Sequence, residues 1–96
     1  MFYIKIHKGL HSVVAICDAD LIGKSFKQGK LRLSISEHFY KGERKNLDEI
    51  THLLVNSSNL NLVGPKIIQL ALSLNLITKK QILVIDGVPH AQIISC

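Results

Sequence analysis

The stretch that decides the fold is QILVIDGVPHAQI, residues 81–93. It opens with an apolar run, Ile82–Ile85, of the length expected for a buried strand. The dipeptide Asp86-Gly87 follows, and such pairs favour two-residue hairpin turns because both positions tolerate positive φ. Beyond the turn, polar and apolar residues alternate as in a half-buried strand. The stretch therefore predicts a C-terminal β-hairpin.

Two residues of this hairpin carry further predictions. Pro89 has no N–H to donate, so we expect its strand to lie at an edge of the sheet. In the register that the turn sets, His90 lies on the side opposite Ala91 and Ile93. A histidine on a half-exposed edge strand is usually structural. We therefore expect His90 to be a possible contact residue and not a catalytic one.

The first third of the chain is also rich in strand patterns. Residues 2–6 alternate apolar and polar side chains, and the β-branched run 13–16 follows a short turn, which predicts a hairpin. LRLSIS, residues 31–36, alternates strictly and predicts a third strand with Arg32 pointing to solvent.

The middle of the chain changes to helical periodicity. Asn46 and Glu49 have the spacing of a capping box before an apolar stripe over residues 47–54. Pro65 suits the first position of a second helix over residues 65–74, because that position needs no N–H donor. Strands, then helices, then strands indicate an α+β protein: a largely antiparallel sheet of about five strands, with two helices packed on one face.

Length and composition limit the remaining possibilities. We expect residues 1–96 to form a single compact α+β domain. The apolar runs are too short to span a bilayer, and the N-terminus lacks the regions of a signal peptide, so a cytoplasmic location without membrane association is expected. Cys17 and Cys96 form neither a CxxC pair nor a framework, which favours two plain thiols in a reducing compartment.

The positive charge is concentrated in one half of the chain. The net charge is +5, and residues 1–45 hold nine Lys and Arg against four acidic residues. Cations interleaved with aromatic residues suit RNA, since the cations neutralise phosphates and the rings stack on bases. The candidate RNA-binding residues are Lys24, Lys27, Lys30, Arg32, Tyr40, Lys41, Arg44 and Lys45. The alternative is a solvated basic loop over core aromatics.

A nucleotide-binding loop is the first enzyme-like alternative. DADLIGKS, residues 18–25, nearly matches the loop GxxxxGK[ST], but Asp18 replaces the first glycine and adds a negative charge where phosphate would bind. A turn between strands is the better interpretation. A ligand pocket near Asp18, Gly23, Lys24 and His90 stays as an alternative, with the balance against an enzyme and no catalytic residue assigned.

A metal site is the second enzyme-like alternative. His7 and His11 are close in sequence, and Cys17, Asp18 and Asp20 could add ligands, but no helix holds the histidines on one face and no CxxC pair is present. The sequence therefore predicts neither a metal nor another cofactor.

Three separated segments also resemble a known family. The segments are CDADLIGKSFKQGKLRLSISEHFYKGE, residues 17–43, NLVG, residues 61–64, and GVPHAQI, residues 87–93. Together they resemble the archaeal domain-of-unknown-function family four hundred and twenty-four, small uncharacterised archaeal proteins. The resemblance implies a small α+β protein from an archaeon, with no assigned reaction and no catalytic residue to carry over.

The functional hypothesis is a small basic accessory protein that binds RNA or a ribonucleoprotein. An association with the translation machinery rests only on size, charge and the archaeal resemblance. One alternative is the ligand-binding protein or enzyme described above. Another is a protein–protein adaptor that uses the C-terminal edge strand. The sequence makes no prediction of the oligomeric state.

Overall fold

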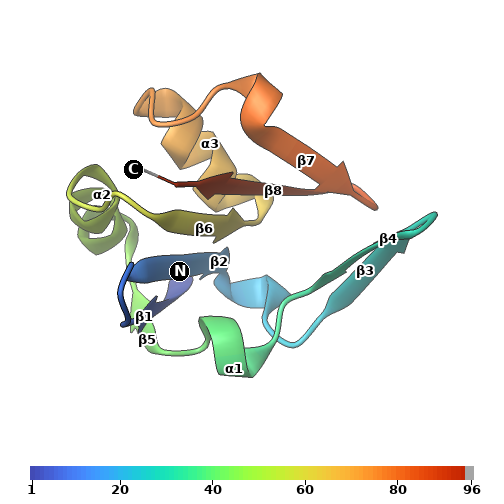
Figure 1. The fold of residues 1–96 in the computed structure, drawn as a ribbon, viewed down its shortest axis with the longest axis horizontal. Coiled ribbons are helices and arrows are strands. Elements are labelled where there is room, and N and C mark those ends of the chain that lie inside the picture. The colour runs from blue at the N-terminus through green and yellow to red at the C-terminus, as the bar shows by residue number, and fades with distance from the viewer. Residues whose placement is uncertain (95–96) are drawn as a thin grey trace.

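The centre of the structure is a six-stranded sheet with the strand order β5-β1-β2-β6-β8-β7 (Figure 1). It is a computed structural model that describes residues 1–94. The strands of this sheet are β1 (Phe2–His7), β2 (Val13–Asp18), β5 (Glu43–Lys45), β6 (Leu60–Val63), β7 (Ile82–Ile85) and β8 (Val88–Ile93). Among these described strands, only the β2–β6 pair is parallel. The protein is α+β, as predicted.

Two helices, α2 (Leu47–Val55) and α3 (Pro65–Ser73), pack on one face of the sheet. The predicted capping box begins α2: the Glu49 N–H donates to the Asn46 side chain at 3.0 Å, and the Asn46 N–H donates to Glu49 at 3.1 Å. Pro65 occupies the first turn of α3. The core between helices and sheet includes Ile16, Ile50, Leu54, Leu62 and Ile67, all buried. The prediction of two helices on one face is confirmed.

The opposite face of the sheet is only partly covered. A second sheet of two strands, β3 (Ser25–Gln28) and β4 (Leu31–Ser34), extends outward as an arm that we call the basic arm (Figure 1). With the short helix α1 (Glu37–Tyr40) and the 3-10 turn η1 (Ala19–Leu21), the arm covers one end of this face. A further 3-10 turn, η2 (Lys79–Gln81), precedes β7. In the described part of the chain, no helix combines the length and the apolar character needed to cross a bilayer.

The C-terminal hairpin forms as predicted, but its place in the sheet differs. Asp86 and Gly87 have φ values of 50° and 80°, as a two-residue turn of this type requires. However, β8 lies between β6 and β7, so the expectation that Pro89 marks an edge strand was wrong. The Pro89 carbonyl accepts from the Gly64 N–H at 2.9 Å, so the backbone of Pro89 faces β6 where that strand ends. The missing N–H is tolerated there because no further β6 residue needs it.

The strand order also changes which strand a protein partner could pair with in the adaptor alternative. The free edges of the described sheet are β5 and β7, and β8 is not one of them. A partner that adds a strand would therefore pair with β7, where Leu83 and Val84 are about half exposed.

The strand predicted over residues 31–36 forms over Leu31–Ser34 but joins the basic arm and not the main sheet. Its partner is β3, with Lys27 opposite Arg32. The sequence pattern specified the alternation correctly, while the pairing partner was not predicted.

Candidate functional site

The basic arm has two chemically different faces. Ser25, Lys27, Arg32 and Ser34 share one face, because they are paired across the two strands at alternate positions. The other face carries Phe26 and Leu33, which pack into the core under the arm. Arg32 is exposed, as expected.

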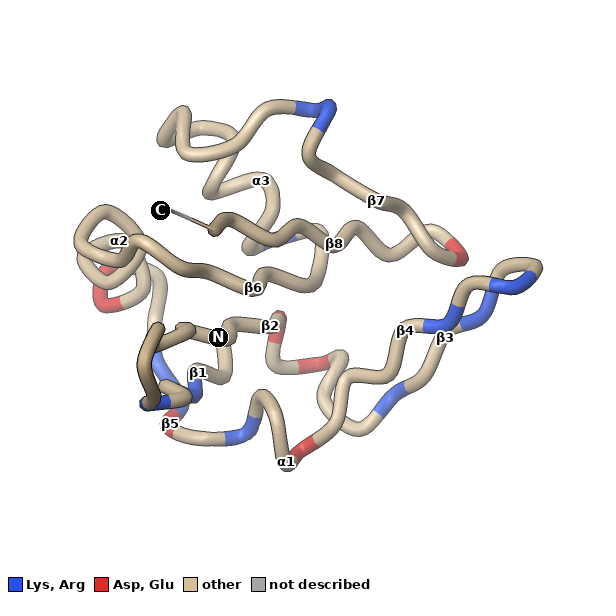
Figure 2. The backbone as a smooth tube through the Cα atoms, in the orientation of Figure 1, with Lys and Arg blue, Asp and Glu red and all other residues tan. Residues whose placement is uncertain are grey.

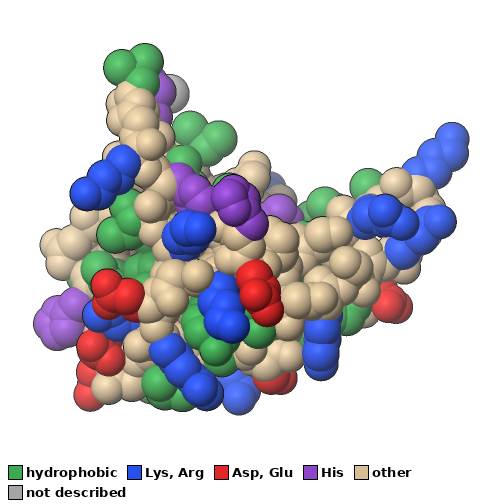
Figure 3. All heavy atoms as spheres, turned by 90° about the horizontal axis from the view of Figure 1, so that it is seen from below, with side chains coloured by type: hydrophobic (Ala, Val, Ile, Leu, Met, Phe, Trp, Pro, Cys, Tyr) green, Lys and Arg blue, Asp and Glu red, His purple; other side chains and the backbone are tan. Residues whose placement is uncertain are grey.

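The cations of the arm lack acidic partners. Lys24, Lys27, Lys30 and Arg32 are all exposed, and in residues 1–94 none of them forms an ion pair. Residues 23–36 contain no acidic residue. Figures 2 and 3 show Lys and Arg residues distributed along the arm, from its base to its end. The arm is therefore a positive surface whose cations form no ion pair within residues 1–94, with Asp86 of the C-terminal hairpin beside it at Gln28.

The second predicted basic group lies on the segment from α1 to β5, away from the arm, and is partly neutralised. Lys41 contacts Glu37 at 3.8 Å, and Lys45 contacts Glu43 at 2.8 Å and Glu49 at 3.6 Å. Hydrogen bonding to Lys45 lowers the pKa of the Glu43 carboxyl, and the same bond raises the pKa of the Lys45 ammonium group.

Arg44 differs from its two neighbours, since its guanidinium lies 5.9 Å from the centroid of the Tyr3 ring. Lys41 lies 6.0 Å from the same ring. Tyr3 is half-buried, so Arg44, Lys41 and Tyr3 form a small cation–aromatic surface beside β5.

Tyr40 does not have the role that the sequence predicted. The residue as a whole is 3% exposed, and its hydroxyl donates to Asn61 Oδ1 at 2.6 Å. Burial raises the pKa of this phenol, so Tyr40 is a neutral core donor. The ring is thus not available to stack on a base. Tyr40 is therefore no longer a candidate RNA-binding residue, because its side chain is buried.

Asp18 is a buried anchor and not a turn residue. Its carboxylate accepts the backbone N–H groups of Lys66 at 2.8 Å and Ile67 at 2.9 Å, at the start of α3. Burial raises the pKa of this carboxyl, while the two N–H bonds act in the opposite direction. Gly64 lies directly against the carboxylate. Asp18 therefore links β2 to α3, and each of its two carboxylate oxygens already accepts a backbone N–H.

The residues of the predicted ligand pocket belong to separate local structures. The Lys24 backbone bonds to Leu21 and Ile35, and Gly23 bonds to Ile35. The His90 ring contacts Asn61, whereas Asp18 contacts α3. Two pockets of about 650 and 700 Å³ in the described chain are lined by other residues.

The residues considered for a metal site are likewise dispersed. His7 Nε2 is 2.8 Å from the Phe39 carbonyl oxygen, and its ring stacks on Phe39 at 4.3 Å between centroids. Cys17 is buried, and burial beside Asp18 raises the pKa of its thiol to about 12, so it stays protonated. In residues 1–94, no three His, Cys, Asp or Glu side chains form a group that could hold a metal ion. Cys96 lies outside the described residues.

A polar network that the sequence did not predict lies behind the uncovered end of the sheet face. Asn61 Oδ1 receives the Tyr40 hydroxyl, and His90 Nε2 lies 3.1 Å from the same oxygen. Because a carboxamide oxygen only accepts, His90 donates through Nε2–H. A lone asparagine inside the buried strand LNLV was the sequence feature that could have pointed to this network.

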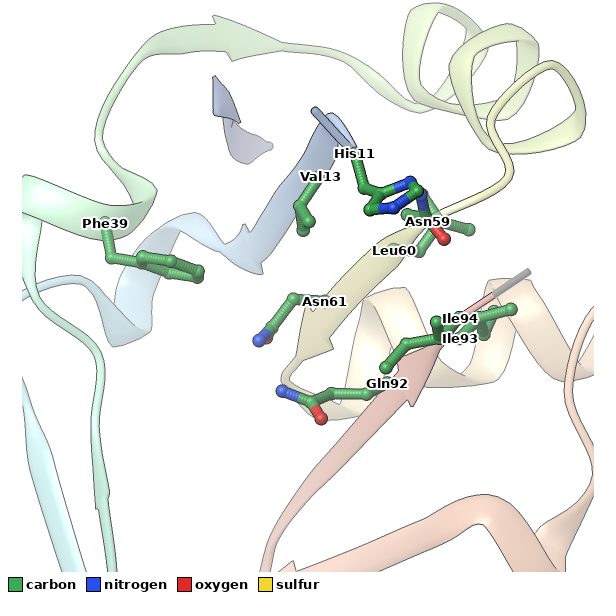
Figure 4. Close-up of a pocket in the computed structure, with 9 residues that line it drawn as sticks. All are labelled: His11, Val13, Phe39, Asn59, Leu60, Asn61, Gln92, Ile93 and Ile94. Carbon is green, nitrogen blue, oxygen red and sulfur yellow. The ribbon is translucent and has the colours of Figure 1, made fainter. Parts of the chain in front are cut away.

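Beside this network is a largely apolar pocket of about 650 Å³ (Figure 4). Its floor crosses three neighbouring inner strands of the sheet, with Val13 on β2, Asn61 on β6 and Gln92 on β8. Phe39 of α1 forms a wall on one side (Figure 4). Its other lining residues are His11, Asn59, Leu60, Ile93 and Ile94. The pocket exists because the arm and α1 leave this end of the sheet uncovered.

The burial of His90 predicts a pH dependence of stability. Burial lowers the pKa of His90 below the value near 6.5 of a free imidazole. On acidification the unfolded chain therefore binds a proton before the folded protein does, and the free energy of unfolding decreases as the pH falls through and below about 6.5. Urea unfolding of His90→Gln across pH 5–7.5 should show a smaller decrease than wild type. His52→Gln, on an exposed position of α2, is the control, and equal pH profiles for wild type and His90→Gln would contradict the assignment.

Comparison with known proteins supports the fold and identifies the family. The chain is similar to a solved structure described as an uncharacterized conserved protein from Methanopyrus kandleri, with a TM-score of 0.76 and 28% sequence identity. The match covers 96% of this chain and 89% of the other. No curated protein matches the sequence. The family model described as protein of unknown function (DUF424) matches residues 6–96, and the chain therefore belongs to the DUF424 family.

Proposed function

We propose that this protein binds RNA, as a strand or within a ribonucleoprotein, through the basic arm. The observation that supports the proposal most directly is the set of exposed arm cations without acidic partners in the described chain: Lys24, Lys27, Lys30 and Arg32. Such cations gain free energy from phosphates because binding releases condensed counterions.

The two basic groups contribute unequally to the proposed interface. Lys41 and Lys45 already face carboxylates, so a phosphate must compete with Glu37, Glu43 or Glu49 for them. The arm cations meet no such competition within residues 1–94. Arg44 with Tyr3 offers a secondary contact, since a guanidinium can bind phosphate while the aromatic ring meets a base or sugar.

A salt titration tests this function. Fluorescence anisotropy with a labelled single-stranded RNA should show binding at low salt, with log K decreasing linearly against log salt concentration. If all four arm cations contact phosphates, the slope should be about −3, since each contact to a single strand contributes about −0.7. The absence of binding at low salt, or a slope near zero, would contradict the proposal.

A second experiment tests the partner class in cell extract. The tagged protein is recovered from extract with and without ribonuclease treatment, and the bound RNA and proteins are compared. Partners held through RNA should be lost after ribonuclease treatment. Recovery of the same partners from both samples would favour direct protein contacts and count against RNA binding.

A further inference from the structure

The pocket beside the Tyr40–Asn61–His90 network contains a hydrogen-bond donor whose orientation is determined by the core. Asn61 is 8% exposed, and its carbonyl oxygen is occupied by the Tyr40 hydroxyl and the His90 Nε2–H. The amide nitrogen is therefore the free end of the side chain. Within residues 1–94 this nitrogen forms no hydrogen bond. The described chain has no buried side-chain nitrogen or oxygen without a hydrogen-bond partner, so the Asn61 amide nitrogen must be in contact with solvent.

A second carboxamide lies directly beside the first. Gln92 is the cross-strand partner of Asn61, and it is exposed. Both side chains line the pocket (Figure 4). Neighbouring side chains in an antiparallel pair are about 5 Å apart at Cβ, so both amides reach one small ligand. Asn61 supplies N–H donors at a determined position, and Gln92 supplies both a donor and an acceptor.

The rest of the lining restricts the chemistry of that ligand. Its described residues include no Lys, Arg, Asp or Glu, and His11 is their one ionisable side chain, so a phosphate or carboxylate would find no permanently charged partner there. Val13 and Ile93 offer apolar contacts, and Phe39 offers an aromatic ring that already stacks on His7 on one side. A cavity of about 650 Å³ accommodates a planar heterocycle with its sugar. The lining thus suits an uncharged, flat ligand with donors and acceptors along one edge.

We propose that this pocket binds a single unpaired nucleobase. The base packs against Phe39 while its polar edge accepts from Asn61 Nδ2 and pairs with the amide of Gln92. Asn and Gln recognise base edges in this way, and RNA-binding proteins commonly hold splayed bases against aromatic rings. The inference rests on the proposed RNA-binding function, which it extends from the phosphate backbone to a base. The same chemistry would also accept a free nucleoside, so the test separates the two sources.

The test uses NMR on the full chain, with the side-chain amide signals of Asn61 and Gln92 as reporters. Adenosine, guanosine, cytidine and uridine are titrated separately, and at least one is expected to shift both amide pairs. Gln92→Ala and Phe39→Leu should each weaken that binding roughly tenfold, as expected for one base-edge contact or one stacking contact. Gln69→Ala, an exposed glutamine of α3, is the matched control and should leave binding unchanged.

An RNA comparison distinguishes failure of the pocket from failure of the arm. A short single-stranded RNA should bind more tightly than the same RNA with abasic positions, and Gln92→Ala should reduce that difference roughly tenfold without changing the salt slope. Nucleoside binding without RNA binding would support the pocket, with a free nucleoside as its ligand, and overturn the arm. Salt-dependent RNA binding with no shift of the Asn61 and Gln92 amides would overturn the pocket and leave the arm intact. Failure of both ligands to bind would overturn both proposals.

Discussion

Gly64→Ala is expected to destabilise the protein by about 4 kcal/mol, a large part of the roughly 5–15 kcal/mol that holds a small domain together. Gly64 has φ 121° and ψ 152°, a backbone conformation that essentially only glycine adopts, and holding an alanine in it costs about 1–3 kcal/mol. An added Cβ would also lie 2.7 Å from both carboxylate oxygens of Asp18. Asp18 would have to move, and each charge-assisted bond lost at the start of α3 costs a further 1.5–3 kcal/mol or so.

Chemical unfolding followed by circular dichroism measures this effect, with Gly87→Ala as the matched control. Gly87 also has positive φ, at 80°, but no atom within 4 Å of the added Cβ, so its replacement should cost only about 1 kcal/mol. Equal costs at the two glycines would show that contact with Asp18 is unimportant.

A double variant keeps this test informative if Gly64→Ala fails to fold. Asp18→Gly removes the carboxylate that the new methyl group meets. The double variant Asp18→Gly/Gly64→Ala should therefore be more stable than the sum of the two single effects predicts. Additive effects would contradict a direct clash.

The double charge reversal Lys27→Glu/Lys30→Glu is expected to weaken RNA binding about 1000-fold at low salt, which corresponds to about 4 kcal/mol. Each substitution replaces an attraction of about 1 kcal/mol with a repulsion of similar size. Loss of two phosphate contacts should also make the salt slope less steep by the contribution of about two contacts. Both side chains are exposed, so the fold should tolerate the change.

Lys79→Glu/Lys80→Glu is the matched control, because it changes the net charge equally at exposed positions of η2, away from the arm (Figure 2). Its affinity for RNA should fall by no more than about threefold, the effect of long-range charge alone. Equal losses in the two double variants would mean that net charge, and not the arm, determines binding.

Much of the local structure was readable from the sequence because it depends on neighbouring residues. Asp86-Gly87 specified a turn, Asn46 and Glu49 specified a helix start, and the alternation over residues 31–34 placed Arg32 toward solvent. Each of these features involves residues within four positions of one another. Short-range sterics and hydrogen bonding are sufficient to determine them.

The strand order required the tertiary structure. The pattern of β8 is the same at an edge as in the interior, so Pro89 was misleading, and only the pairing of Val63 with His90 shows that β8 is an inner strand. The same limit applies to the basic arm, because the alternation over residues 31–34 predicted the strand β4 but did not identify β3 as the strand that pairs with it.

For the candidate sites too, local features could be predicted from the sequence, whereas contacts between distant segments could not. Exposed cations on the arm could be predicted, since charge and strand alternation are local properties of residues 24–32. Tyr40 could not be placed, because the pattern of its own segment does not reveal that its hydroxyl meets Asn61, 21 residues away. Asp18 resembled a turn former for the same reason, since its partners on α3 lie 48 and 49 residues further along the chain. By itself, the sequence determined the turns, caps, strand faces and charge of this protein, whereas contacts between distant segments decided its strand order, its buried polar groups and its pocket.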